Sequence, residues 1–153
     1  MSLNVVETLL EENRGGIWYI AAPKEPRALQ KVAKAAGYAF FHIDGKTIGR
    51  KEQLLTHMAT AMQFPKEFGQ NWDALEDHLT DLEWVDADGY VIYYDHIDKL
   101  LEQHADQFET FLEIVRDAVS SWQDDGEAMV VLLSGTRAPK GVAKLGAKEK
   151  EAE

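Results

Sequence analysis

Three acidic side chains lie close together in the segment 71–82, NWDALEDHLTDL. If this segment is helical, Asp73, Glu76 and Asp77 occupy positions i, i+3 and i+4, so their side chains are neighbours on one face. Like charges at this spacing repel one another in an isolated helix. The pattern is typical either of a solvated acidic face or of an anionic surface that docks a cationic partner.

A capped helix would position these acids. Asn71 is a favourable N-cap because its side-chain oxygen can accept a hydrogen bond from an early helical N–H. Gly69 can adopt the left-handed or strained backbone that a tight helix entry needs. We therefore predict a helix from Trp72 to about Asp81 that buries an apolar stripe and exposes its acids. The stripe consists of Trp72, Leu75, Leu79 and Leu82.

A second acidic group follows two apolar runs. Asp44 and Asp95 each end such a run, and His96 and Asp98 come directly after the second. Ligands of open α/β sheets bind outside the carboxyl ends of the strands, and oxygen-rich sets of this kind hold Mg²⁺. An aspartate after a strand more often caps a turn or begins a helix. We therefore predict no metal site, and a magnesium-dependent carboxylate enzyme is the weaker alternative.

Other catalytic signatures are incomplete. Asp44-Gly45-Lys46-Thr47 ends like a phosphate-binding loop, but the preceding glycine, Gly37, lies eight positions before Gly45 where the motif needs five. The sequence contains no G-x-G-x-x-G or G-x-S-x-G, its five histidines lack H-x-x-x-H spacing, and it has no cysteine. We expect no catalytic residues and no cofactor, and we predict that the protein is not an enzyme.

Composition limits the partners. The chain has 153 residues, with 27 acids against 16 lysines and arginines and a formal charge of −11. Such a surface disfavours nonspecific binding to nucleic acid or to an anionic membrane. The N-terminus lacks a secretion signal, and no stretch approaches the ~20 apolar residues of a membrane span. We expect a cytoplasmic monomer whose partner is a basic protein.

Apolar runs alternate with helical periodicity, which predicts an α/β fold. Near-continuous apolar runs are typical of parallel strands that are covered on both faces. The predicted strands are 17–22, 38–43, 90–94 and 128–133, and the predicted helices besides 72–81 are 2–13, 26–36, 50–63, 97–101 and 106–122. These elements predict a four-stranded parallel sheet flanked by helices.

One domain is expected over residues 1–135, since this length suits a single core. From Thr136 onward the sequence loses its periodicity and becomes polar. We predict a flexible tail over residues 136–153.

The segment around the acidic helix resembles a known family. Residues 68–75, FGQNWDAL, preceded by Pro65 and followed by Asp77 and Leu79, are similar to the helix that defines the barstar family, intracellular inhibitors of barnase-type ribonucleases. The resemblance covers about residues 40–134. It implies a barstar-like parallel sheet, to which residues 1–37 add an N-terminal strand–helix extension.

The resemblance implies that the acidic helix blocks the cationic active site of a basic ribonuclease, as an antitoxin or immunity protein would. Asp77 corresponds to the family's central carboxylate, which takes the place of an RNA phosphate, and Asp73 to its neighbour one turn earlier. A carboxylate accepts a bidentate guanidinium much as a phosphate does. Asp117 matches a peripheral glutamate of the family. The predicted ribonuclease-binding residues are Asp77, Asp73, Glu76, Phe68, Gly69, Asn71, Thr80, Asp117, Glu67 and Trp84.

Two positions depart from the family pattern. Glu67 stands where the best-known inhibitor has a tyrosine, and Phe68 keeps an aromatic ring without the hydroxyl. The alternative function is therefore an acidic protein–protein interaction module for a different basic partner, because both functions need the same surface.

Overall fold

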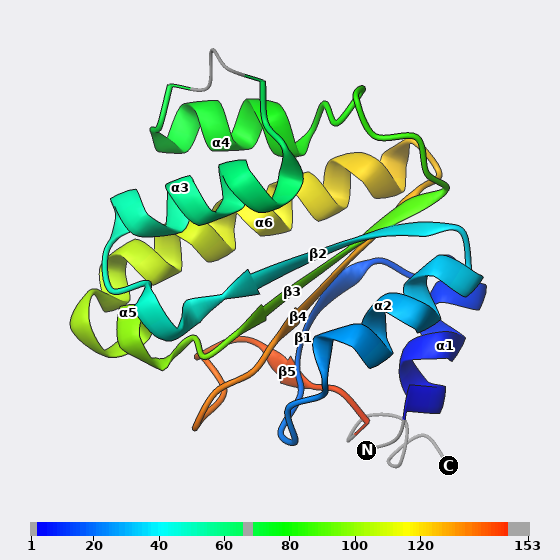
Figure 1. The fold of residues 1–153 in the computed structure, drawn as a ribbon, viewed down its shortest axis with the longest axis horizontal. Coiled ribbons are helices and arrows are strands. Elements are labelled where there is room, and N and C mark those ends of the chain that lie inside the picture. The colour runs from blue at the N-terminus through cyan, green and yellow to red at the C-terminus, as the bar shows by residue number, and fades with distance from the viewer. Residues whose placement is uncertain (1–2, 66–68, 147–153) are drawn as a thin grey trace.

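A single five-stranded parallel sheet runs through the molecule, in the order β2-β3-β4-β1-β5 (Figure 1). The computed structural model describes residues 3–65 and 69–146. The predicted α/β class and barstar-like parallel sheet are confirmed, with five strands instead of four. The strands are β1 (Gly16–Tyr19), β2 (Tyr38–Asp44), β3 (Gly89–Asp95), β4 (Ala128–Leu133) and β5 (Ala143–Lys144).

Six α-helices and one short 3₁₀ turn are described in these parts of the chain. The turn, η1 (Gly45–Thr47), follows β2 directly. It is capped by Asp44, whose side chain accepts a hydrogen bond from the Lys46 N–H. No described helix is long and apolar enough to cross a membrane. The helices are α1 (Leu3–Glu11), α2 (Pro26–Ala35), α3 (Lys51–Met62), α4 (Trp72–Leu79), α5 (Asp98–Gln103) and α6 (Ala105–Asp124).

The fifth strand comes from the segment that the sequence assigned to a flexible tail. Trp18 pairs with Ala143 and Tyr19 with Lys144, and the Leu145 N–H donates a 2.8 Å hydrogen bond to the Tyr19 carbonyl. Leu145 is only 3% exposed. The prediction was wrong here because two exposed strand residues carry no apolar alternation. Residues 147–153 lie outside the described residues.

The direction in which the chain crosses the sheet decides which face each helix covers. From β2 through β3 to β4 the chain advances one strand at a time, so right-handed crossovers place α3 to α6 on one face. From β1 to β2 it passes back across the sheet, so α2 lies on the opposite face, next to α1 (Figure 1). The N-terminal extension thus adds β1 to the sheet, and its helices α1 and α2 cover the second face.

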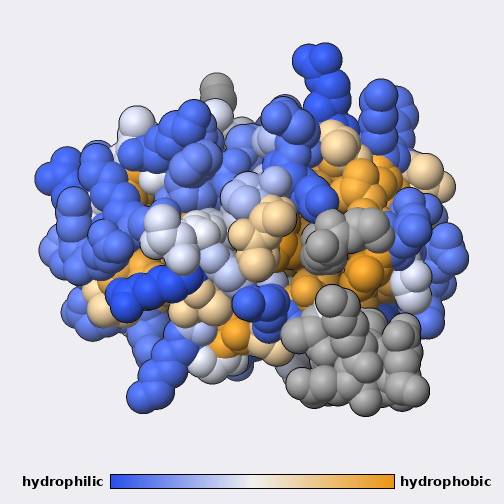
Figure 2. All heavy atoms as spheres, turned by 90° about the horizontal axis from the view of Figure 1, so that it is seen from below, coloured by the Kyte–Doolittle hydropathy of each residue, from blue (hydrophilic) through white to orange (hydrophobic). Residues whose placement is uncertain are grey.

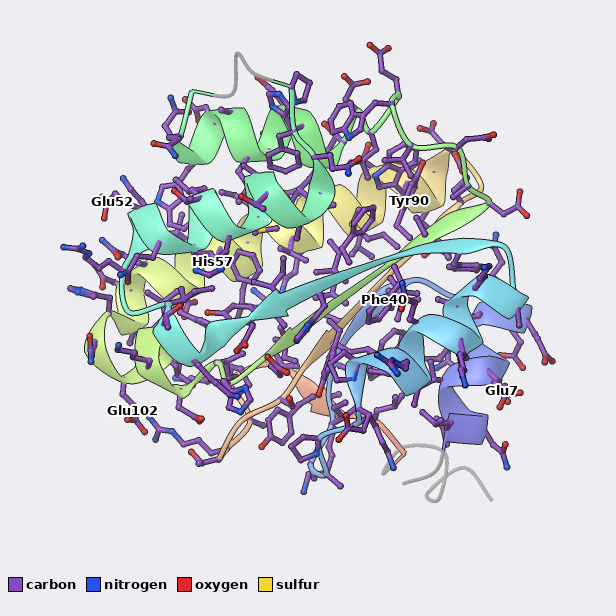
Figure 3. All side chains as sticks on the ribbon, in the orientation of Figure 1. Glu7, Phe40, Glu52, His57, Tyr90 and Glu102 are labelled. Atoms are coloured by element: carbon purple, nitrogen blue, oxygen red, sulfur yellow. The ribbon has the colours of Figure 1, made fainter. Side chains whose placement is uncertain are left out.

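Strand β3 shows how both faces are filled. Tyr90, Ile92 and Tyr94 join the core under α3 to α6, whereas Val91 and Tyr93 join the core under α1 and α2. Figure 3 labels Tyr90, which belongs to the first core, and the partly buried Phe40, which packs against the second. Every residue of β3 is buried, which explains the continuous apolar run in its sequence. On the face seen in Figure 2, hydrophilic side chains predominate on the left and hydrophobic side chains gather in a patch on the right.

Candidate functional site

The acidic side chains lie on a capped and well-packed helix, α4. The Asn71 side-chain oxygen accepts a 2.7 Å hydrogen bond from the Ala74 N–H, as an N-cap does. Leu75 and Leu79 are completely buried. The opposite face exposes the side chains of Asp73, Glu76 and Asp77.

The entry to α4 differs from the prediction that Gly69 supplies a left-handed residue. Gln70 takes this conformation, with φ 51°, and its amide donates a 3.0 Å hydrogen bond to the Thr56 hydroxyl. A Cβ atom at Gly69 would lie 3.2 Å from the Asn71 Nδ2 atom. Gly69 therefore leaves room for the capping side chain.

Helix α4 ends at Leu79, two residues before the predicted end. The Thr80 hydroxyl donates hydrogen bonds to the carbonyls of Glu76 and Asp77, at 2.9 and 3.2 Å. The Glu76 carbonyl also accepts the Thr80 N–H at 3.1 Å, so the acceptor that depends on the hydroxyl is the Asp77 carbonyl at the helix end. Thr80 is half-buried, and its hydroxyl is hydrogen-bonded to main-chain carbonyls at the helix end.

No described residue neutralises the acidic face of α4. Among the parts of the chain that the structure describes, the ion pairs of acids involve Glu12, Asp44 and Asp95, and none involves Asp73, Glu76 or Asp77. The Lys51 Nζ atom lies 5.9 Å from the centroid of the Trp72 ring, so this cation contacts the aromatic ring of α4. The mutual repulsion of the three carboxylates is thus not offset by an ion pair to a described residue.

Two tryptophans fix the region around α4. The Trp122 Nε1–H of α6 donates a 2.8 Å hydrogen bond to the Leu79 carbonyl. The Trp84 Nε1–H donates a 2.9 Å hydrogen bond to the Met62 carbonyl at the end of α3. The Trp84 ring also packs edge-on against Phe64, with 6.0 Å between centroids. Trp122 therefore ties the end of the acidic helix to α6, and Trp84 ties the segment after α4 to the end of α3.

The other predicted binding residues have varied surroundings. Asp117 is exposed on α6, and Trp84 is half-buried. Glu67 and Phe68 lie outside the described residues. The N-terminal extension does not cover α4, since α1 and α2 belong to the core on the opposite face of the sheet.

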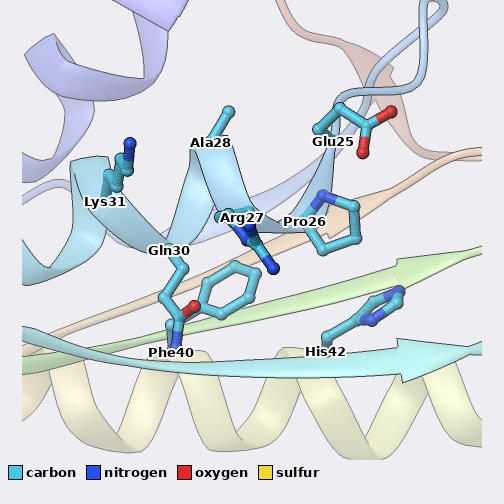
Figure 4. Close-up of a pocket in the computed structure, with 8 residues that line it drawn as sticks. All are labelled: Glu25, Pro26, Arg27, Ala28, Gln30, Lys31, Phe40 and His42. Atoms are coloured by element: carbon cyan, nitrogen blue, oxygen red, sulfur yellow. The ribbon is translucent and has the colours of Figure 1, made fainter.

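A pocket that the sequence did not predict lies on that opposite face, between α2 and β2 (Figure 4). Its volume is about 760 Å³, and Phe40 and His42 line it from the sheet side. None of the predicted ribonuclease-binding residues that the structure describes lines it. The lining residues are Glu25, Pro26, Arg27, Ala28, Gln30, Lys31, Phe40 and His42.

The acids at the carboxyl ends of β2 and β3 do meet in space. Asp44 and Asp95 are register partners, and the His96 Nδ1 atom lies 3.2 Å from Asp95 Oδ1 and 3.7 Å from Asp44 Oδ1. The His42 Nε2 atom lies 2.9 Å from Asp95 Oδ2. Asp98 is engaged elsewhere, because its Oδ1 accepts hydrogen bonds from the Thr136 N–H and hydroxyl. Sequence analysis missed His42, whose only signal is its position two residues before Asp44.

Comparison with known proteins decides the family. A family model described as "Barstar (barnase inhibitor)" matches residues 38–134, more than half of the chain. The chain belongs to the barstar family. The match begins at β2 and ends after β4, so this barstar-family chain carries α1, β1 and α2 before the matched region and β5 after it. No curated protein matches the chain.

Solved structures share the wider fold of this barstar-family chain. The ORC2 protein of Aeropyrum pernix, in ADPNP-ADP complexes, superposes with a TM-score of 0.59 at 13% identity, over 87% of this chain and 39% of its own. A chain of Drosophila ORC bound to DNA gives 0.52 at 11% identity, over 99% and 88%. Another, from Drosophila ORC bound to AT-rich DNA and Cdc6, gives 0.50 at 10%, over 88% and 44%. This barstar-family chain thus spans less than half of the Aeropyrum pernix protein and of the Drosophila chain from the complex with AT-rich DNA and Cdc6. At these identities the likeness concerns the fold alone.

Proposed function

We propose that this barstar-family protein inhibits a basic, barnase-type ribonuclease by placing α4 in the enzyme's cationic active site. The observation that carries the proposal is the exposure of Asp73, Glu76 and Asp77 on one face of a capped helix, without an ion pair to any described residue. The proposal includes a free inhibitor that is monomeric and cytoplasmic.

Electrostatics supports this role. A ribonuclease must bind RNA phosphate, so its active site presents cationic side chains. The carboxylate of Asp77, one turn after that of Asp73, offers such a site two acceptors on a short stretch of helix. Each can take a bidentate hydrogen bond from a guanidinium, as a phosphate does. The helix would also fill the cleft and exclude RNA sterically.

The rigidity of α4 supports the same role. Binding costs less when the interacting side chains are already held in place. The Asn71 cap and the Trp122 hydrogen bond hold the two ends of the helix. The free energy of the charge contacts can therefore contribute to affinity, because little of it is needed to order the helix.

Binding and inhibition of a barnase-type ribonuclease by single variants test the proposal. We expect Asp77→Ala to weaken the complex by about 2–5 kcal/mol, roughly 30- to 4,000-fold in Kd, mainly through faster dissociation. This is the scale for one partner lost from a buried charge pair, and complexes of the barstar family are among those from which it was established. Asp73→Ala should cost less.

The matched control is Glu7→Ala, which removes one negative charge from an exposed position on α1. It should leave affinity unchanged, and so should Lys140→Ala, which lies outside α4. Unchanged affinity of the Asp77→Ala variant, with the wild type bound, would refute the central role of Asp77. A larger loss from Glu7→Ala than from Asp77→Ala would place the interface on the other face.

The second candidate function is docking to a basic protein that is not a ribonuclease. The departures from the family pattern at Glu67 and Phe68 favour it, because they lie beside the acidic helix in sequence. Capture of partners with the wild-type protein and with the Asp77→Ala variant, followed by an RNA-cleavage assay on the captured basic protein, separates the two functions. Capture of a protein without RNA-cleaving activity would favour the second.

A further inference from the structure

A cluster of metal-ligating side chains, none of them on α4, lies where β2 and β3 end. Asp44 closes β2, Asp95 closes β3 beside it in register, and His96 follows directly. One ligand atom from each of these three residues lies within 4.8 Å of the others. The cluster joins two strands that are 51 residues apart in sequence, counting from Asp44 to Asp95.

Asp95 is the unusual member of this cluster. Its side chain is only 9% exposed, and its Oδ2 atom pairs with His42 Nε2 at 2.9 Å. Its Oδ1 atom is buried and forms no hydrogen bond with a described residue. A buried carboxylate oxygen without a donor is costly. The group nearest to it in the cluster is the His96 Nδ1 atom, at 3.2 Å.

We propose that Asp44, Asp95 and His96 bind a divalent ion of the first transition series, such as Mn²⁺ or Zn²⁺. The distances fit this chemistry. Two ligand atoms that each lie about 2.1 Å from one ion are separated by about 3.0 Å at a right angle and about 3.4 Å at the tetrahedral angle. The His96 Nδ1 atom lies 3.2 Å from Asp95 Oδ1 and 3.7 Å from Asp44 Oδ1. The His96–Asp95 separation already fits, and the His96–Asp44 separation exceeds the tetrahedral value by a few tenths of an ångström. All three ligand atoms lie within 4.8 Å of one another.

The ligand types determine which ion is preferred. An imidazole nitrogen beside two carboxylates suits Mn²⁺ or Zn²⁺ better than Mg²⁺, which favours an all-oxygen set with several waters. His42 supplies the supporting contact, since its hydrogen bond to Asp95 Oδ2 orients the carboxylate. Asp44 and His96 have side chains that are 49% exposed, so an ion can reach the site from solvent and keep bound water.

The backbone holds the two strand ends together. A Cβ atom at Gly45 would collide with the carbonyl oxygens of Asp95 and His96. Only glycine permits this close approach. The ligands therefore sit on strand ends whose separation is set by main-chain packing.

Binding of Mn²⁺ to the full chain, freed of metal with a chelator, tests the proposal by the loss of the electron paramagnetic resonance signal of free Mn²⁺. We expect one ion per chain with a Kd below roughly 1 mM, and a rise in Tm when Mn²⁺ or Zn²⁺ is added. Mg²⁺ should bind more weakly than Mn²⁺. Asp95→Asn and His96→Asn should each weaken Mn²⁺ binding more than about tenfold.

Asparagine is chosen at both positions because it should leave the fold intact. Asparagine matches the size of Asp95, and it tolerates the left-handed backbone of His96, φ 52°. Circular dichroism and Tm without metal check that both are folded. The control Glu7→Gln removes an exposed carboxylate from α1 and should bind Mn²⁺ like the wild type. Failure of the wild type to bind Mn²⁺ or Zn²⁺, or undiminished binding by both cluster variants, would overturn the proposal, as would Mg²⁺ binding tighter than Mn²⁺.

Discussion

The indole Nε1–H of Trp122 donates a 2.8 Å hydrogen bond to the main-chain carbonyl of Leu79. This buried bond joins the end of the acidic helix α4 to the last turns of α6. It uses a carbonyl at a helix end, where intrahelical partners are lacking. The position of the acidic face therefore depends on a residue 43 positions away from Leu79 in sequence.

Replacing Trp122 by phenylalanine keeps an aromatic ring but removes the donor. We expect the free energy of unfolding to fall by about 1–3 kcal/mol, because the Leu79 carbonyl is left buried without its partner. Urea denaturation measures this loss. If α4 binds a ribonuclease as proposed, affinity for it should also fall, since a less firmly held helix must be ordered on binding. A variant as stable as the wild type would show that solvent or another donor replaces the bond.

The Asn71 cap gives a second prediction. Asn71→Ala removes the acceptor of the Ala74 N–H and should lower the free energy of unfolding by about 1 kcal/mol. Asn71→Ser, which also caps helices, should recover most of that stability. Thermal or urea denaturation of the two variants provides the comparison. An equal loss in the free energy of unfolding in both variants would mean that the helix cap is not the source of the loss.

Two neighbouring tyrosines of β3 make a matched pair. The Tyr93 hydroxyl bonds to the main chain of Lys24 and to the Ser134 hydroxyl, whereas the buried Tyr94 hydroxyl has no hydrogen-bond partner among the described residues. Tyr94→Phe should therefore raise the free energy of unfolding by about 1 kcal/mol, and Tyr93→Phe should lower it by about 1–2 kcal/mol. Urea midpoints of both variants test the sign, and a loss of stability in Tyr94→Phe would contradict the prediction.

Alkaline pH should destabilise the fold. Burial, and then the nearby charges of Asp95 and Asp98, raise the pKa of Tyr94 well above its ordinary value of 10.0. Burial also raises the pKa of Tyr93. In the unfolded chain these phenols lose their protons near pH 10, while the folded chain keeps them. Stability is therefore fully present below about pH 10 and falls as the pH rises above it.

Urea midpoints at pH 7, 9, 10 and 11 measure this decline. We expect nearly constant tyrosine contributions up to about pH 9 and a fall beyond about pH 10, by at most about 1.4 kcal/mol per pH unit for each tyrosine. Tyr94→Phe should make the fall shallower, because it removes one titrating phenol. An equally steep fall in this variant would assign the effect to other groups.

The helices and strands were largely predictable because their signals are local. Asn71 caps α4 as predicted, and Leu75 and Leu79 of this helix are buried. Strand β3 is buried along its whole length, as its continuous apolar run indicates. Strand β5 could not be predicted, since Ala143 and Lys144 are exposed and their pairing with β1 depends on where the sheet edge lies.

The sequence by itself determined the α/β class, the acidic face of α4 and the family resemblance, because each depends on residue types within a short stretch or a motif. Only the tertiary structure decided that β1 lies between β4 and β5, that α1 and α2 cover the face opposite α4, and that Asp44, Asp95 and His96 meet beside His42. These relationships join distant segments. Hydrophobic periodicity shows which face of an element is buried, but not which element covers it.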